Sequence, residues 1–275
     1  MNCIGYVAVH ATITAWKCGN MATNPKTAIA PAIEFRDVEF RVNEHVILKR
    51  FSLDVQRGET LVLLGRSGSG KTTALKLVNR LFESTAGEVR VEGQSTLAWD
   101  SIRLRRHIGY VIQEAGLFPH FTVERNVGLV PHLENWEETR VSERVNELLR
   151  LVGLEPAQFA RRYPSELSGG QRQRVGVARA LAADPPILLM DEPFGSLDLL
   201  TRAEIQQEFL ALQRKMHKTV LFVTHDIGEA LLLGNRIALL EAGDLRGIYA
   251  PEEFLHSTEP IAAAYVSALR VGIAS

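Results

Sequence analysis

One stretch decides the fold of this chain: Gly65-Arg66-Ser67-Gly68-Ser69-Gly70-Lys71-Thr72-Thr73. It fits the pattern G-x-x-x-x-G-K-[ST], in which glycines let successive backbone N–H groups turn inward around phosphate oxygens. In such a P-loop the lysine reaches the β- and γ-phosphates of a nucleotide, and the hydroxyl after it binds Mg²⁺. The apolar run 60–64 predicts a buried strand before the loop, and 74–78 predicts a helix after it. We therefore expect a nucleotide-phosphate site here; the alternative is a glycine-rich turn that fits the pattern by chance.

The composition is that of a globular protein of one or two domains. The chain has 275 residues and a formal net charge of −1, so it can bury a large core and no nucleic-acid partner is expected. No apolar run approaches the roughly 18 residues needed to cross a bilayer. Cys3 and Cys18 lie outside every motif, which favours a reducing, cytosolic setting. Residues 1–30 lack the basic start and cleavage site of a signal peptide, so we expect a flexible leader or a misassigned start codon.

Strands alternate with helices along the rest of the chain. Period-two patterns predict strands at 32–40 and 46–55, with a turn between them. Later segments predict strands at 88–91, 108–112, 187–190 and 220–223, and helices at 101–105, 171–183 and about 205–216. The segment 114–170 has a helical pattern throughout. We therefore expect an α/β fold, with a doubly wound P-loop nucleotidase core, an N-terminal antiparallel β region and an inserted α-helical subdomain at about 114–170.

Two carboxylates, Asp191 and Glu192, follow the apolar strand 187–190. In P-loop nucleotidases an acid at this place helps to hold Mg²⁺, and Asp191 fits that role. The neighbouring Glu192 can accept a proton from the water that attacks the γ-phosphate. The alternative is an acidic pair that only caps the next helix.

The most specific motif is Leu167-Ser168-Gly169-Gly170-Gln171. Its glycines open a predicted helix, whose free N–H groups and serine hydroxyl make a second phosphate-binding device, far in sequence from Lys71. With this pentapeptide the sequence resembles the ATP-binding-cassette (ABC) ATPases, whose signature it is. The resemblance covers roughly residues 32–250 and implies a RecA-like core that binds ATP and Mg²⁺.

The resemblance assigns roles to further residues. Glu192, His225 and Gln113 become the catalytic set, with His225 as the switch histidine and Gln113 as the Q-loop glutamine. Gln113 also joins Thr72 and Asp191 as a metal ligand. Ser196, Leu197 and Asp198 resemble the D-loop, with Gly195 where alanine is more usual, and Phe40 lies where the family stacks an aromatic ring on adenine. Each residue also has a simpler interpretation. His225 could be a histidine at a strand end whose hydrogen bonds are satisfied, Gln113 could be a surface loop residue, and Phe40 could be a core residue.

The family resemblance also implies which subunits the chain binds and where in the cell it lies. The signature of one subunit closes over the P-loop of a second, so we expect a homodimer with ATP between its chains. The loop 114–121 is expected to bind a permease subunit. The alternative is that its apolar residues only fill the hydrophobic core. A solute-binding protein would act indirectly, and the chain would lie at the cytoplasmic face of the inner membrane. On this view 31–250 is the ABC ATPase domain and 251–275 a short helical tail.

A finer resemblance is to import ATPases for quaternary-amine osmoprotectants such as glycine betaine, choline and carnitine. It is based on the segments 77–81, 108–120 and 126–131. Several members of that subfamily carry a paired nucleotide-sensing module after the ATPase, whereas about 25 residues follow Ala250 here, enough for one predicted helix. The alternatives are an ATPase of another ABC transporter, for example an amino-acid or methionine type, and a soluble ABC ATPase of repair, translation or cluster assembly.

Overall fold

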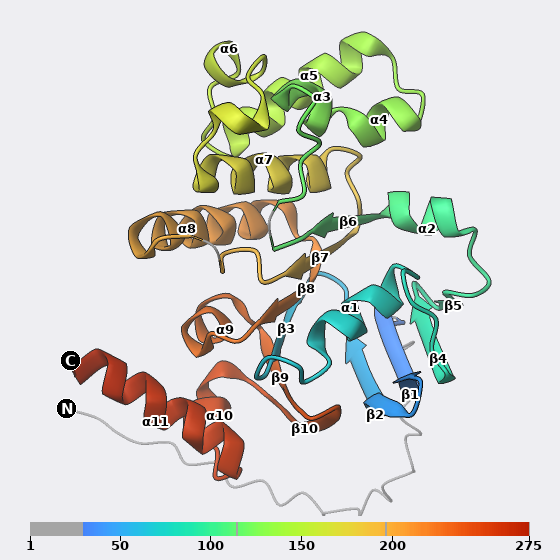
Figure 1. Cartoon of the computed structure of the whole chain (residues 1–275), viewed down its shortest axis with the longest axis vertical. Coiled ribbons are helices and arrows are strands. Elements are labelled where there is room, and N and C mark those ends of the chain that lie inside the picture. Colours follow the sequence, from blue (N-terminus) through green and yellow to red (C-terminus); the bar gives the residue numbers. More distant parts are fainter. Residues whose placement is uncertain (1–29, 114, 196, 275) are drawn as a thin grey trace, which may run out of the picture.

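The computed structural model describes residues 30–113, 115–195 and 197–274, with side chains up to Arg270 (Figure 1). Residues 1–29, which make up nearly all of the predicted leader, lie outside the described residues, as do Glu114 of the predicted partner loop and Ser196 of the predicted D-loop.

Two sheets form the α/β part of the molecule. The larger has six strands in the order β10-β9-β3-β8-β7-β6, in which the neighbours from β9 to β6 pair in parallel and β10 pairs antiparallel. The smaller has four antiparallel strands in the order β2-β1-β4-β5. The strands are β1 (Ile33–Val42), β2 (His45–Val55), β3 (Thr60–Leu64), β4 (Ala86–Val91), β5 (Gln94–Ser95), β6 (Ile108–Val111), β7 (Ile187–Asp191), β8 (Thr219–Thr224), β9 (Arg236–Glu241) and β10 (Asp244–Tyr249).

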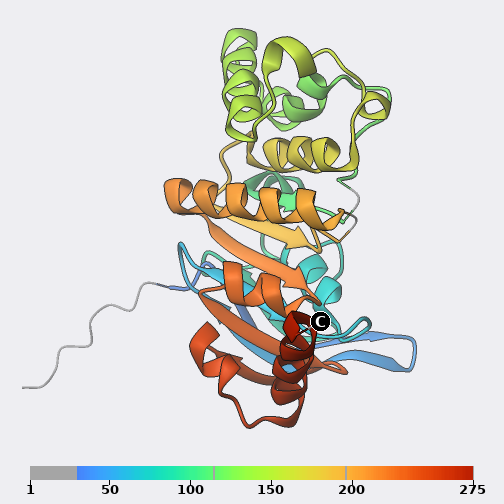
Figure 2. The same ribbon diagram turned by 90° about the vertical axis from the view of Figure 1, so that its left-hand side faces the viewer.

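The helices cover the parallel sheet and form a separate layer at one end of the molecule. They are α1 (Lys71–Val78), α2 (Ser101–His107), α3 (Val123–Val127), α4 (Leu129–Leu133), α5 (Glu138–Leu151), α6 (Pro156–Phe159), α7 (Gly169–Leu181), α8 (Leu199–Met216), α9 (Ile227–Leu233), α10 (Pro251–Leu255) and α11 (Pro260–Ala274), with a 3₁₀ turn at Pro164–Glu166. In Figures 1 and 2 the helices α3 to α6 gather at the end opposite α11, inserted in the chain between β6 and α7. No helix of the described ranges combines the length and the apolar character needed to cross a membrane.

The central strand β3 shows why the chain folds in layers. Leu61 and Leu63 pack into the core shared with α1 and the antiparallel sheet, whereas Val62 and Leu64 pack into the core shared with α7, α8 and α9. Because side chains alternate along a strand, a strand buried on both faces is apolar throughout. The predicted α/β core, antiparallel β region and helical insertion are thus confirmed.

The parallel strands also bring the predicted motifs to one edge of the sheet. β3 pairs with β8, and β8 pairs with β7, all in parallel. The loops at their carboxyl ends therefore begin side by side, and in open α/β sheets ligands bind at this edge. One predicted boundary is wrong: α7 begins at Gly169 rather than at 171, because Ser168 caps the helix and accepts a hydrogen bond from the Gln171 N–H.

Candidate active site

The P-loop curves around the amino group of its own lysine. Gly68 and Gly70 have φ values of 80° and 104°, which favour glycine. At Gly70 a Cβ would also lie 2.7 Å from Cδ2 of Leu48, so a side chain has no room there. Lys71 Nζ donates to the carbonyls of Gly65 at 2.7 Å and Arg66 at 2.9 Å. Burial lowers the pKa of Lys71, and the carboxylates of Asp191 and Glu192 oppose this effect.

Several groups at the P-loop fit a phosphate and a magnesium ion. Ser69 Oγ is buried and lacks a hydrogen-bond partner among the described residues, as expected of a group that binds an absent ligand. Thr72 Oγ1 donates to Asp191 Oδ1 at 2.8 Å, which places a hydroxyl and a carboxylate together. Over the described ranges no group of three or more His, Cys, Asp or Glu side chains is arranged to hold a metal ion. Two protein oxygens completed by phosphates and water suit Mg²⁺.

Asp191 is a buried acid at the end of β7. Burial raises its pKa, while the hydrogen bond from Thr72 lowers it. The Tyr110 hydroxyl donates to Asp191 Oδ2 at 3.5 Å, and burial together with the Asp191 charge raises the pKa of Tyr110. Tyr110 was missed from the sequence as a site residue, although it lies in β6, the strand that pairs with β7.

Glu192 and His225 meet where β7 and β8 end. His225 Nδ1 lies 2.9 Å from Glu192 Oε2. Glu192 has a φ of 44°, a conformation rare for a residue with a side chain, and its N–H donates to the carbonyl of Val223 on β8. Strained backbone of this kind concentrates at functional sites. The arrangement suits a carboxylate base oriented by a histidine.

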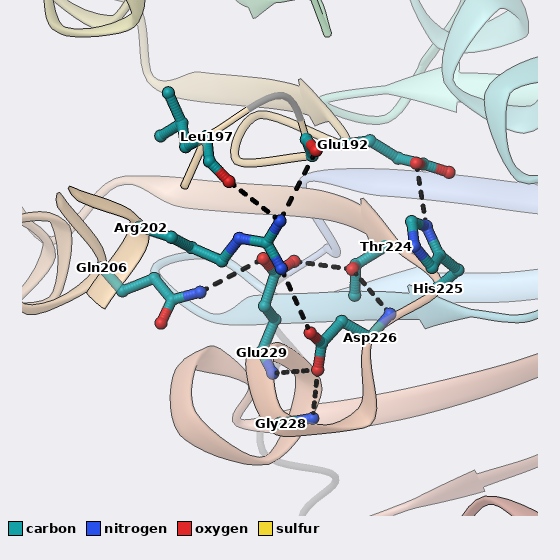
Figure 3. A network of polar contacts seen from close by, with 10 residues as sticks. Glu192, Leu197, Arg202, Gln206, Thr224, His225, Asp226, Gly228 and Glu229 are labelled. Atoms are coloured by element: carbon teal, nitrogen blue, oxygen red, sulfur yellow. Dashed lines mark hydrogen bonds and ion pairs between the residues drawn. The ribbon is translucent and has the colours of Figure 1, made fainter. Parts of the chain in front are cut away.

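A polar network missed by the sequence analysis connects the loop after β7 to the loop after β8 (Figure 3). At its centre is Arg202 in the first turn of α8. Its Nη2 donates to the carbonyl of Leu197 at 3.2 Å and to that of Gly195 at 3.5 Å, and its Nη1 lies 3.7 Å from Asp226 Oδ2. One guanidinium therefore links the predicted D-loop to the residue after His225.

A buried carboxylate, Glu229, completes this network. It accepts hydrogen bonds from Thr224 Oγ1 at 2.6 Å and Gln206 Nε2 at 3.1 Å, and burial raises its pKa. Thr224 Oγ1 also accepts from the Asp226 N–H at 3.0 Å, so both neighbours of His225 are fixed. The spacing of Asp226 and Glu229 at the start of α9 resembles a capping box, which was the available sequence signal.

The predicted signature forms a capped helix start. Ser168 Oγ accepts from the Gln171 N–H, and the Gln171 side chain accepts from the Ser168 N–H. A Cβ at Gly170 would lie 2.5 Å from Thr201 Cγ2, so α7 and α8 begin in close contact. In Figures 1 and 2, α8 and β7 lie between α7 and α1. The two predicted phosphate-binding devices of one chain therefore do not meet.

The structure places Gln113 and Phe40 in different surroundings. The exposed Gln113 borders a cleft of about 820 Å³ that also includes Thr72 and Asp191, near the place predicted for the metal. Phe40 is only 8% exposed, and its ring stacks on Phe82 with centroids 5.1 Å apart. Phe82 is itself 38% exposed, so the paired rings lie at the edge of the core, and stacking of Phe40 on adenine stays a prediction.

Residues 48–195 match the family model described as ABC transporter. The glycine betaine/carnitine/choline transport ATP-binding protein OpuCA of Bacillus subtilis is 51% identical over 205 residues, 74% of this chain and 54% of that protein. The glycine betaine uptake system ATP-binding protein YehX of Escherichia coli is 47% identical over 213 residues, 78% of this chain and 69% of that protein. The chain spans about half the length of several curated relatives it matches.

A solved dimeric ATP-binding cassette in a post-hydrolysis state, bound to ADP and Pi, has a TM-score of 0.72 and 36% identity to the chain. The match covers 80% of this chain and 98% of that one. Nearly the whole of that fold is thus matched by this chain. Because the family model also spans more than half of the sequence, the chain belongs to the ABC transporter family.

Proposed function

We propose that the chain is the ATP-hydrolysing subunit of an ABC importer. The observation that carries this proposal is the pairing of Glu192 with His225, beside the P-loop and next to Asp191. Lys71 and the N-terminus of α1 would bind the β- and γ-phosphates. Mg²⁺, held by Thr72 and Asp191 and approached by Gln113, would offset the phosphate charge. Glu192 then accepts the proton of the attacking water, and His225 orients the carboxylate.

The ATP site is proposed to be completed by a second copy of the chain. The start of α7, with Ser168 and Gly169 exposed, is separated from the P-loop of its own chain. A helix N-terminus attracts anions, so this end of α7 suits a phosphate presented by another subunit. A two-fold dimer would bind two ATP molecules between its chains and open once hydrolysis removes the γ-phosphate contacts.

The permease subunit is proposed to bind the loop after Gln113. Phe118 is 41% exposed there and packs with His120 and Phe121. The buried Asn126 fixes this loop, because its side chain bonds the backbone of Phe118, Phe121 and Thr122. A rigid loop with exposed aromatic rings suits protein contact. Through the permease, the chain would lie at the cytoplasmic face of the membrane and be served indirectly by a solute-binding protein.

The transported solute is proposed to be a quaternary amine such as glycine betaine, choline or carnitine, as named for the relatives above. Uptake of labelled glycine betaine and of labelled methionine can be compared in cells with and without the chain. Loss of the betaine uptake alone is expected. Loss of methionine uptake alone would assign another solute while leaving the ATPase proposal in place.

The catalytic proposal is tested by Glu192→Gln. We expect ATP turnover to fall about 100-fold or more, because positioned proton transfer is worth roughly 10² to 10⁴. Mg-ATP binding should remain, and ATP should now trap a dimer on gel filtration. Glu204→Gln, an exposed change on α8, is the matched control and should turn over normally. Near-normal turnover of the Glu192 variant would remove the residue from this role.

A further inference from the structure

We propose that Arg179 anchors the loop after Gln113 to the signature helix α7, so that this loop and the signature of the same chain move together. Arg179 is thus assigned as a positioning residue, which acts through the backbone of the loop and does not touch ATP. The inference rests on the proposed function, because it connects the proposed permease contact to the proposed two-chain ATP site.

Arg179 lies in the last turn of α7 and reaches two consecutive carbonyl groups of the loop. Its Nη2 donates to the carbonyl of Ala115 and its Nη1 to that of Gly116, both at 2.7 Å. Because a guanidinium presents its donors in a rigid plane, two such bonds fix the orientation of the turn as well as its position. Burial lowers the pKa of Arg179, which is consistent with a cation held between protein groups and largely removed from water.

The backbone of α7 also contacts the turn directly. A Cβ at Gly176 would lie 3.2 Å from the Cβ of Ala115, and Ala115 itself is only 2% exposed. Ala115 has a φ of 57°, a conformation that persists in a residue with a side chain only where the surroundings hold it. Its N–H donates to the carbonyl of Ile112 at 3.0 Å, which closes a turn that contains Gln113. The base of the loop is therefore packed against α7 at the position of Gln113.

The other end of the loop is attached to α3. The Asn126 side chain of α3 donates to the carbonyls of Phe118 and Phe121, both at 3.1 Å. α3 packs against α7, and Val123 and Val127 share one core with the apolar side chains of α7. In Figure 1 the chain passes from β6 along α7 to α3. The segment 115–121 is thus held at both ends by helices that pack against each other.

A single helix connects this loop to the signature. From Gly169 to Arg179, α7 spans roughly 15 Å at 1.5 Å per residue. A force applied to the loop by a permease would therefore displace Ser168 and Gly169, which are proposed to face a partner's ATP. Coupling between two binding sites is reciprocal, so closure of the signature over that ATP should also act on the loop.

The first test measures hydrogen exchange in the nucleotide-free chain. Arg179→Met removes the two donors, so amides in 115–121 should exchange about tenfold faster or more, since bonds from a charged donor are strong. The control is Arg174→Met on the same helix, because Arg174 donates to the Val152 carbonyl at 2.8 Å and pairs with Glu208 instead. This control should leave exchange in the loop unchanged.

The conservative variant Arg179→Lys keeps a charged donor but loses the planar pair, so a smaller acceleration in 115–121 is expected. It decides the test if Arg179→Met does not fold. Unchanged exchange of the loop in the Arg179 variants, or an equal acceleration in Arg174→Met, would overturn the anchoring role.

The second test asks whether Arg179 transmits closure of the dimer. In the Glu192→Gln chain, Mg-ATP should slow exchange both at the start of α7 and in 115–121, because both are then restrained by the partner subunit. With Arg179→Met added, the start of α7 should still be protected, whereas the response of the loop should be lost.

The outcomes of this second test separate the two proposals. A dimer whose loop responds equally to Mg-ATP with and without Arg179, or does not respond at all, would overturn the transmission alone. A Glu192→Gln chain that stays monomeric with Mg-ATP on gel filtration would overturn the proposed dimer and the transmission together.

Discussion

At the scale of single residues, Asp191 shows how a ligand-binding group opposes stability. Burial raises its pKa, so the ionised carboxylate is less favourable in the folded chain than in the unfolded one. Its contribution to stability is therefore present at acid pH and lost as the pH rises through the folded pKa. A bound magnesium ion would favour the ionised form.

Asp191→Asn should therefore stabilise the nucleotide-free protein. We expect the Tm at neutral pH to rise by a few degrees, because about 1 kcal/mol corresponds to roughly 2–4 °C in a protein of this size. The difference from the parent should vanish at acid pH, and the stabilisation by Mg-ATP should be lost. Calorimetric scans across pH measure both effects, with the exposed Asp244→Asn as control. A variant less stable than the parent at neutral pH would contradict this account of Asp191.

At the scale of elements, Arg202 makes α8 a connection between two loops. Its guanidinium bonds the carbonyls of Gly195 and Leu197 and pairs with Asp226, next to His225. Removing it should misplace His225 without disturbing the phosphate ligands. Arg202→Met should lower kcat about 10- to 100-fold with little change in the KM for ATP, since small misplacements have effects of this size.

A double-mutant cycle separates this role from general destabilisation. If Arg202 acts through Asp226, then the double variant with Arg202→Met and Asp226→Asn should lower kcat no more than the more damaging single change does. Arg202→Lys should restore part of kcat, and Arg214→Met, an exposed change on the same helix, should have no effect. Steady-state kinetics with thermal melts give the answer. Additive losses, or a KM that rises with every variant, would indicate two independent structural roles.

At the scale of the whole molecule, the separation of α7 from α1 predicts complementation between damaged chains. Lys71→Ala removes the lysine of a P-loop, and Ser168→Arg obstructs a signature. Each variant alone has two damaged sites in every dimer. In a mixed dimer one composite site carries both defects and the other carries neither, so the mixture should recover part of the ATP-dependent light scattering. No recovery, with mixed contact shown by crosslinking, would contradict the composite site.

Much of the site was predictable because its parts lie at the ends of parallel strands. A motif that follows an apolar strand must lie at the edge where its neighbours end, which placed Lys71, Asp191, Glu192 and His225 together. The ring that covers Phe40 was not predictable, because Phe82 lies 42 positions later in the sequence. Nor was the ion pair of Arg202 with Asp226, which depends on how α8 packs against α9. Local sequence patterns predict the strand end or helix at which a residue lies, whereas tertiary packing determines which side chains it contacts.

The lysine enclosed by the P-loop has a further consequence for nucleotide affinity. A free lysine side chain carries roughly 2 kcal/mol of rotamer entropy, which a phosphate contact would otherwise have to overcome. The two carbonyls of Gly65 and Arg66 immobilise Lys71 before any nucleotide arrives. That entropy is lost when the chain folds, not when ATP binds. When a nucleotide binds, its phosphate oxygens replace the backbone carbonyl oxygens around an ammonium group that is already in place.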